Sequence, residues 1–239
     1  MTQTPTPYQG LRVEEVEEQR TKLFVPHSGG ELTFLHPAYG PGTYANVGLA
    51  IVQDGLKRPS MEETASLVHA AFNAGDKYST EIKDIMQQAW LWGFTGTLYV
   101  PKEGAFIQDD PEIRYGMPFM DRESLEQKLN AKDPSVRHVP FGYKVGEMSP
   151  LELAKNPYVV GLAGEEGAEQ LARVADKHSD KPYLWSFESV DRNETRVSAL
   201  DSGRLDRGLD VNGDFPGNYR VGRAFGVFEK TSGASRAEK

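Results

Sequence analysis

Residues 196–227 read RVSALDSGRLDRGLDVNGDFPGNYRVGRAFGV, and this stretch decides which fold we expect. It is rich in glycine, has no apolar stripe at helical spacing and ends in the apolar run AFGV. Short runs of apolar and β-branched residues separated by glycine are typical of strands joined by turns. We therefore expect residues 194–229 to form a glycine-rich β ribbon with exposed loops.

Helical signals fall in the first two thirds of the chain. Ser60 and Glu63 have the spacing of a capping box at the start of a helix. Residues 79–90 carry one continuous apolar stripe at helical spacing, and Asp121 can cap a shorter helix. Residues 165–178 carry another apolar stripe at helical spacing. The two glutamates in its first turn interact favourably with the helix dipole, and this interpretation needs no catalytic role for them.

The order of these elements predicts an α+β fold, with helices in the first two thirds and the β ribbon at the C-terminus. Residues 91–101, LWGFTGTLYVP, have the aromatic and β-branched composition of a closely packed strand. Pro- and Gly-marked turns recur at short intervals with no linker or repeat, so residues 11–231 are expected to form a single domain. The polar ends, residues 1–10 and 232–239, are predicted to be flexible.

The composition limits the function classes. The 35 acidic and 27 basic residues give a net charge of −8, which argues against a nucleic-acid partner. No stretch reaches the roughly 20 apolar residues of a membrane helix, and the start has no signal-peptide pattern. We therefore expect no membrane insertion and a cytoplasmic or virion-associated protein. The absence of cysteine excludes disulfides and thiolate chemistry.

A search for catalytic or metal-binding motifs gives little. The segment Asp210–Asp214 resembles the start of a calcium loop, but the positions that need glycine and glutamate are Phe215 and Val221. An ordinary turn at Asn212-Gly213 is the favoured interpretation, and no cofactor or metal is expected. Core packing is the favoured interpretation for the tryptophans, which are Trp90, Trp92 and Trp185. A position at the surface or at a helix end is the favoured interpretation for the histidines, which are His27, His36, His69, His138 and His178.

The C-terminal ribbon is the strongest candidate for a binding surface. It interleaves polar and aromatic side chains with small or apolar residues, as antibody combining sites do. An ordinary solvated hairpin region fits this composition equally well. The candidate ligand-binding residues are Asp201, Arg204, Asp206, Arg207, Asp210, Asn212, Asp214, Phe215, Asn218 and Tyr219, and the scaffold residues expected beneath them are Leu205, Leu209, Val211, Phe225 and Val227.

The same stretch resembles the C-terminal end of a C-type-lectin fold of the formylglycine-generating-enzyme type. In that fold a closing strand with an R-x-G-x-x-F-G-V-like pattern completes the sheet, and Arg220, Gly222, Phe225, Gly226 and Val227 match it. More specifically, the stretch is similar to the variable proteins of diversity-generating retroelements, which occur in phages, archaeal viruses and small-genome archaea. The close match covers about the last thirty-five residues.

The resemblance implies a binding function without an active site. In such proteins a reverse transcriptase rewrites adenine-templated positions near the 3′ end of the gene while the fold is kept, and the ten candidate residues are of types that this process yields. The expected ligand is a macromolecule, with a protein favoured, and the oligomeric state is left open. Formylglycine-generating enzymes need catalytic cysteines, which this chain lacks, so their chemistry is not expected here.

Two alternatives remain from other classes. One is a hydrolase or transferase whose carboxylates or histidines are assembled only by the fold, and a cleft lined by such groups with perturbed pKa values would favour it. The other is a structural virion component with no ligand of its own, which burial of the ribbon in an assembly would favour.

Overall fold

The computed structural model describes residues 11–17, 20–202 and 208–229, and of residues 15–17 it describes the backbone alone. The predicted flexible ends, residues 1–10 and 232–239, lie outside this range. The helices are α1 (Tyr44–Gln53), α2 (Met61–Phe72), α3 (Lys77–Gln88), α4 (Arg122–Asn130), α5 (Pro150–Lys155) and α6 (Pro157–Ala175). The strands are β1 (Arg12–Glu17), β2 (Arg20–His27), β3 (Gly30–Gly42), β4 (Leu91–Val100), β5 (Gly104–Asp109), β6 (Ile113–Arg114), β7 (Met117–Pro118), β8 (Val136–Val139), β9 (Gly146–Glu147), β10 (Tyr183–Trp185), β11 (Glu194–Asp201), β12 (Asp210–Phe215) and β13 (Gly222–Val227).

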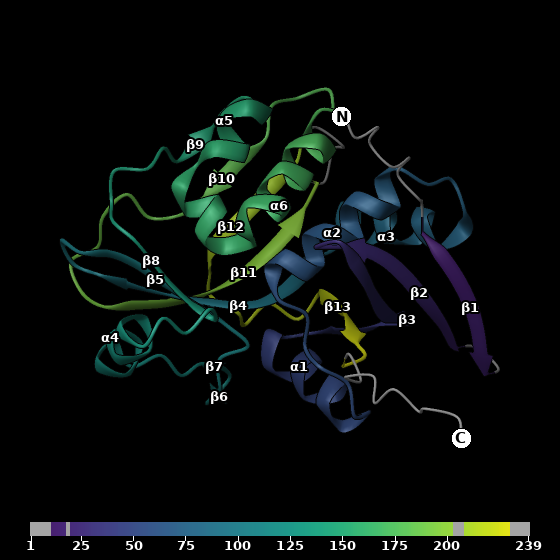
Figure 1. The fold of residues 1–239 in the computed structure, drawn as a ribbon, viewed down its shortest axis with the longest axis horizontal. Coiled ribbons are helices and arrows are strands. Elements are labelled where there is room, and N and C mark those ends of the chain that lie inside the picture. Colours follow the sequence, from purple (N-terminus) through teal and green to yellow (C-terminus); the bar gives the residue numbers. More distant parts are fainter. Residues whose placement is uncertain (1–10, 18–19, 203–207, 230–239) are drawn as a thin grey trace, which may run out of the picture.

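Most strands of the described chain join one mixed sheet (Figure 1). Its order is β1-β2-β3-β13-β4-β11-β12-β10-β9, and β5 and β8 branch from β4. The closing strand that the sequence predicts is β13, which pairs with β3 and, at one residue, with β4. Strands from the two ends of the chain are therefore neighbours in the sheet.

Glycines allow β13 to lie close to its neighbours. A Cβ atom at Gly222 would lie 2.0 Å from Nε1 of Trp92, and one at Gly226 would lie 2.6 Å from a methyl group of Leu56. The side chains of Phe225 and Val227, predicted as scaffold, are buried. The glycine pattern of the closing strand thus has a packing reason.

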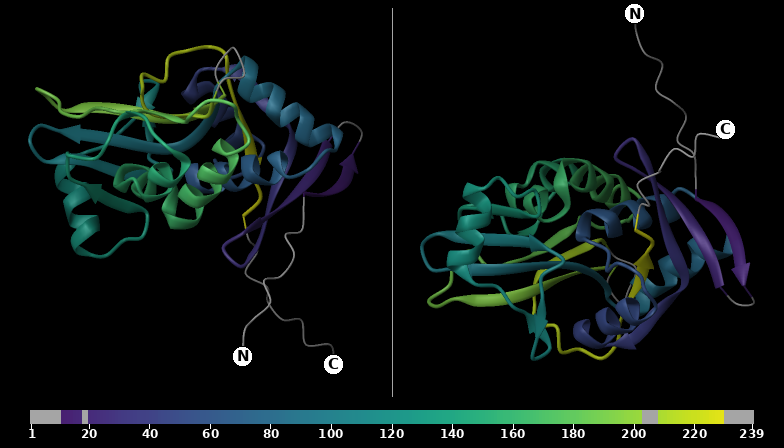
Figure 2. Two further views of the ribbon diagram at one scale, coloured as in Figure 1. Left: turned by 90° about the horizontal axis from the view of Figure 1, so that it is seen from above. Right: turned by 60° about the horizontal axis from the view of Figure 1, so that its bottom comes forward.

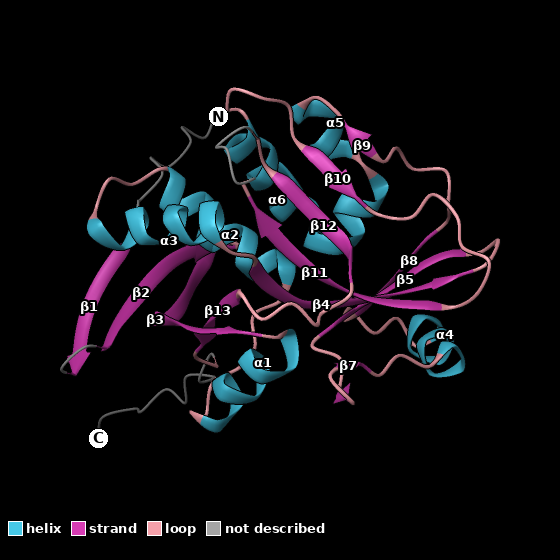
Figure 3. Cartoon of the chain, turned by 180° about the vertical axis from the view of Figure 1, so that it is seen from behind, coloured by secondary structure: helices cyan, strands magenta, loops and turns pink. Residues whose placement is uncertain are grey.

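The central strand β4 is buried along its whole length because apolar groups cover both of its faces. Leu91 and Tyr99 belong to the main core, with α2 and α6, whereas Trp92 and Phe94 belong to a second cluster with α1. Helices α5 and α6 cover one face of the C-terminal strands β10, β11 and β12 (Figure 2). The opposite face of β10 and β12 has no helix over it within the described chain, whereas α3 contacts β11 (Figure 3).

The helices begin where local sequence signals place them. Ser60 and Glu63 form the predicted capping box of α2, and the Asp121 side chain accepts a hydrogen bond from the Ser124 backbone N–H to cap α4. The stripe predicted from residue 79 is α3, which begins two residues earlier because Asp76 is its cap. The helix predicted over 165–178 is the second half of α6, which breaks at Gly164 (φ 70°).

The α+β class is confirmed, but the predicted order of helices first and strands last is wrong. Three strands, β1 to β3, precede the first helix. Leu23 and Val25 on β2 alternate with outward residues and pack into the main core, as strand periodicity requires. Ser28 and Gly29 connect β2 to β3 with φ of 45° and 71°, the two positive values of a tight hairpin turn.

Candidate functional site

Strand β12 runs through the centre of the candidate site. It pairs antiparallel with β11 and parallel with β10, and Asn212 lies opposite Ala199 and Trp185. The turn predicted at Asn212-Gly213 is therefore wrong, since both residues lie inside the strand. No group of three His, Asp or Glu side chains in the described ranges could hold a metal ion, and the calcium loop has no support there.

Strand alternation separates the residues of the three C-terminal strands into two sets. Leu184, Leu200 and Val211 are fully buried in the main core beneath the sheet. Their neighbours in sequence point to the other face, because successive side chains of a strand alternate. We call this set the outer face, and it comprises Tyr183, Trp185, Ala199, Asp201, Asp210, Asn212 and, after the bulge in β12, Phe215. Ala199 and Asn212 are buried on this side, and the other members are exposed or half-buried.

The outer face contains a carboxyl pair. Asp201 and Asp210 are directly opposite each other in the antiparallel register, and their side chains are hydrogen bonded. Partial burial, and then the charge of Asp201, raise the pKa of Asp210 from its ordinary 3.8 to about 7. Two carboxylates this close resist joint ionisation, so the pair keeps a shared proton near neutral pH.

Two further side chains hold this pair in place. Asn212 donates a hydrogen bond from Nδ2 to Oδ2 of Asp201 at 3.0 Å. The indole N–H of Trp185 donates to Asp210, which favours the ionised form and partly offsets the rise in its pKa. The Trp185 side chain is 43% exposed, so the prediction that it packs in the core is wrong.

An aromatic cluster adjoins the outer face. Phe215 is half-buried, with its ring centroid 4.8 Å from that of Trp90 and 5.5 Å from that of Trp92. Tyr219 is 47% exposed, and its ring centroid lies 4.8 Å from that of Trp90 with the two rings tilted. Trp92 is fully buried, as predicted, whereas Trp90 is only half-buried and meets two candidate binding residues. Nothing in the sequence pattern distinguished Trp90 from Trp92.

The remaining predicted residues lie apart from the carboxyl pair. Asp214 lies at a bulge in β12, where partial burial raises its pKa, and its charge interacts with Arg196 and with Tyr158 of the main core. Asn218 is exposed in the loop before β13. Arg204, Asp206, Arg207 and the scaffold residue Leu205 lie outside the described residues. The scaffold residues Leu209 and Val211 are buried, as predicted.

A buried tyrosine network holds the bulge from below. The hydroxyls of Tyr99 and Tyr158 both donate to the carbonyl of Gly213, at 2.9 and 3.3 Å. A Cβ atom at position 213 would lie 2.0 Å from the Tyr158 hydroxyl, so only glycine fits there. Burial raises the pKa of Tyr158 to about 12, so the hydroxyl stays protonated as a donor. The network fixes the backbone that carries Asn212 and Phe215.

The histidines lie away from the outer face. His69 lies in the last turn of α2, in agreement with the predicted helix-end position, but it is buried there, and burial lowers its pKa to about 4. His36 is also largely covered and contacts Glu81 at 2.7 Å. His138 is exposed, in agreement with the prediction.

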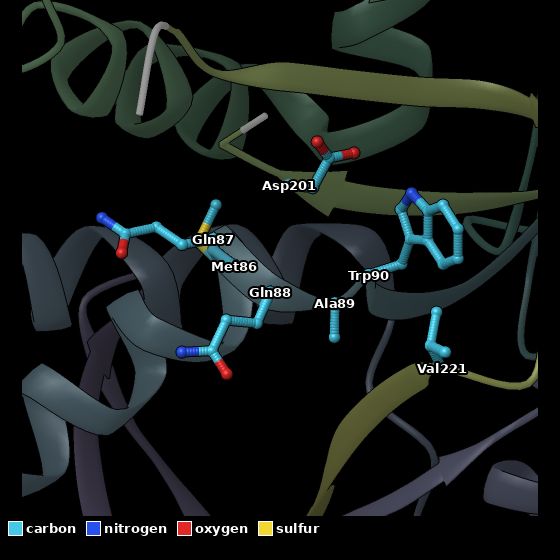
Figure 4. A pocket seen from close by; sticks show the side chains of 7 residues that line it. All are labelled: Met86, Gln87, Gln88, Ala89, Trp90, Asp201 and Val221. Carbon is cyan, nitrogen blue, oxygen red and sulfur yellow. The ribbon is translucent and has the colours of Figure 1, made fainter. Parts of the chain in front are cut away.

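A cavity of about 100 Å³ opens beside the carboxyl pair (Figure 4). The end of α3, Trp90, Asp201 and Val221 form its walls. The site thus combines exposed aromatic rings, a carboxyl pair with a raised pKa and a small cavity, features that can contact a ligand through apolar area and directed polar groups.

Comparison with protein-family models, with curated proteins and with solved structures found no match for this chain. No helix in the described part of the chain is long and apolar enough to cross a membrane.

Proposed function

We propose that this chain is a non-catalytic binding protein with a C-type-lectin-like fold, and that its outer face is a recognition surface diversified by a retroelement. The ligand is a macromolecule, with a protein favoured. The observation that supports the proposal is that side chains of the C-terminal strands alternate between a buried inner face and the outer face. Candidate variable residues Asp201 and Asp210 are partly exposed on the outer face, whereas Leu200 and Val211 are fully buried on the inner face; Asn212 also points to the outer side but is buried there.

Such a division is what a diversified surface requires. A residue that points away from the core can change with little effect on stability, since large costs come from cavities, overpacking and buried polar groups. The inner set cannot vary in this way, because Leu200 and Val211 are fully buried. Exposed rings such as Tyr219 and Trp185 supply the aromatic contact area that binding hot spots use.

Sequencing the DNA around the gene tests this function. We expect an imperfect repeat of its 3′ end, beside a reverse-transcriptase gene, with differences confined to adenine positions. The structure sharpens this expectation, since the differing codons should include those of Asp210 and Asn212 and exclude those of Leu200 and Val211. Absence of the repeat, or differences that fall on the inner residues, would refute the proposal.

One observation favours a second candidate, a hydrolase that uses the carboxyl pair. Asp210 with a pKa of about 7 can donate a proton at neutral pH, and its partner Asp201 lines a cavity. Asp210→Asn would abolish such an activity. Turnover of a chromogenic ester or glycoside by the wild type that is lost in this variant would establish the hydrolase, and equal rates in both would exclude it for those substrates.

A further inference from the structure

Another cavity lies between α5, the start of α6 and the segment that follows β8 (Figure 1). It measures about 600 Å³. Cavities that hold small organic molecules measure roughly 300 to 1,000 Å³, so this one has room for such a ligand. None of the described residues that line it belongs to the outer face, so the two features are separate.

The walls of this cavity are mainly apolar. Phe141 and Tyr143 line it from the segment after β8, and Leu151 lines it from α5. Leu151 is 65% exposed, and Phe141 is half-buried. A ligand with an apolar body would cover this surface and remove it from water, which is favourable.

Hydrogen bonds within the protein hold these walls in place. The hydroxyl of Tyr143 donates to the carbonyl of Phe187 at 2.8 Å. The buried side chain of Asn156 donates from Nδ2 to the carbonyl of Lys144 at 2.8 Å, and its oxygen caps α6. These polar groups are satisfied before any ligand binds, so they fix the shape of the cavity and leave its apolar surface to the ligand.

One positive charge at this cavity is left unmatched. Lys144 Nζ lies 2.9 Å from Oε1 of Glu152. The hydrogen bonds from Ser149, and then the Lys144 amine, lower the pKa of Glu152 from 4.5 to about 2, so these two charges balance each other. The amine of Lys155 also lines the cavity, and it has no hydrogen bond or ion pair in the part of the chain that the structure describes.

We propose that this cavity binds a small organic carboxylate. Its apolar body would lie against Phe141 and Leu151, and its carboxylate would lie beside the exposed amine of Lys155. An alcohol with the same body would keep the apolar contact but lose the ion pair, and an ammonium would be repelled by the amine. The cavity would therefore select among ligands of one size by their charge, at a site apart from the proposed recognition surface.

A titration of the ¹⁵N-labelled protein with sodium octanoate at pH 7.5 tests this site. A carboxylate and a lysine amine are both charged at this pH. We expect a saturable shift of the backbone N–H signal of Gly142, which lines the cavity, and no shift for Gly75, which lies in the loop before α3. Octan-1-ol should bind about three- to fivefold more weakly, which is the contribution of an exposed ion pair, and octylammonium more weakly still.

Substitutions of Lys155 separate the effect of charge from that of shape. Lys155→Met removes the charge and keeps the apolar stem, so it should weaken octanoate binding about threefold and leave octan-1-ol binding unchanged. Lys155→Arg keeps the charge and should bind octanoate as the wild type does. Lys132→Met removes the same charge at an exposed position after α4 and should change neither affinity.

Substitutions of Leu151 test the apolar wall. The side chain is largely exposed, so both variants should fold. Leu151→Glu adds a negative charge and removes apolar area, so it should weaken octanoate binding about tenfold. Leu151→Met conserves the volume and should stay within about twofold of the wild type.

Three results would overturn the proposal. The Gly142 signal could show no saturable shift, the wild type could bind octan-1-ol as tightly as octanoate, or Lys155→Met could bind octanoate as tightly as the wild type. None of these experiments involves a macromolecular ligand or the outer face. The carboxylate site can therefore fail while the recognition surface stands, and a missing DNA repeat would refute the diversified surface while leaving the carboxylate site in place.

Discussion

Replacing Asp210 with asparagine should stabilise the protein at alkaline pH and leave it nearly unchanged in acid. The pKa of Asp210 rises from 3.8 to about 7 on folding, chiefly through burial and then through the Asp201 charge. Between these two values the folded chain holds a proton that the unfolded chain has released. The wild type therefore loses stability as the pH rises from about 4 to about 7. An asparagine does not ionise, so Asp210→Asn should not lose stability over this pH range.

The structure also sets the size of the effect. A rise from 3.8 to about 7 corresponds to at most about 4 kcal/mol, at about 1.4 kcal/mol per pKa unit. The side chain is partly exposed, and solvent screening reduces such energies, so we expect about 2 kcal/mol. The asparagine can keep both hydrogen bonds, since its amide can donate to Asp201 and its oxygen can accept from Trp185.

Urea denaturation of wild type and Asp210→Asn at pH 4 and pH 8 measures the difference. We expect the free energies of unfolding to agree within about 0.5 kcal/mol at pH 4 and the variant to exceed the wild type by about 2 kcal/mol at pH 8. Asp191→Asn, at an exposed loop position, is the control and should show no gain at either pH. An equal effect at both pH values, or destabilisation at pH 8, would refute the shared proton.

Four further substitutions, with Gly75→Ala as a control, test how the outer face is supported. Phe215→Ala should cost about 2 kcal/mol of unfolding free energy because the ring is half-buried, and Tyr219→Ala should cost about 1 kcal/mol because its ring is more exposed. Calorimetry measures both costs, and equal costs would contradict this ordering. Gly222→Ala should cost about 3 kcal/mol because its Cβ would overlap a buried indole, whereas Gly75→Ala, with nothing within 4 Å, should stay within about 0.5 kcal/mol. Tyr99→Phe removes a buried donor and should cost about 1 to 3 kcal/mol in urea denaturation, and a neutral effect would show that the network does not hold the bulge.

Helix starts could be predicted because their causes are local. Ser60 and Glu63 satisfy each other's backbone groups across three residues, and Asp121 caps α4 in the same short range. The N-terminal hairpin was missed although its alternation at Leu23 and Val25 is also local. A Ser28-Gly29 turn between two alternating runs was the signal that could have found it.

Predictions failed where distant residues decide the conformation. Asn212-Gly213 has a strong turn preference, but two tyrosine hydroxyls hold the Gly213 carbonyl and keep the pair inside β12. The apolar neighbours of Trp185 suggested a buried position, but β10 has an uncovered face and alternation turns the indole outward. Sequence spacing shows neither the tyrosine hydroxyls that hold Gly213 nor the uncovered face of β10.

Candidate residues could be identified by type, but their grouping could not. Asp201 and Asp210 face each other only because β11 and β12 pair in one register, and a shift by one residue would move one carboxylate into the core. Trp90 joined the site through contacts with Phe215 and Tyr219 that span more than a hundred residues.

The two sides of β12 make different demands on the sequence, and the proposed recognition function depends on this difference. On the inner side, Val211 fills the main core and Gly213 leaves no room for any side chain beneath the tyrosine hydroxyls. These contacts fix the register, since a slipped strand would bring Asp210 or Asn212 against the apolar core. With the register fixed from below, the proposed binding function predicts that changes to the outer side chains alter the ligand before they alter the fold.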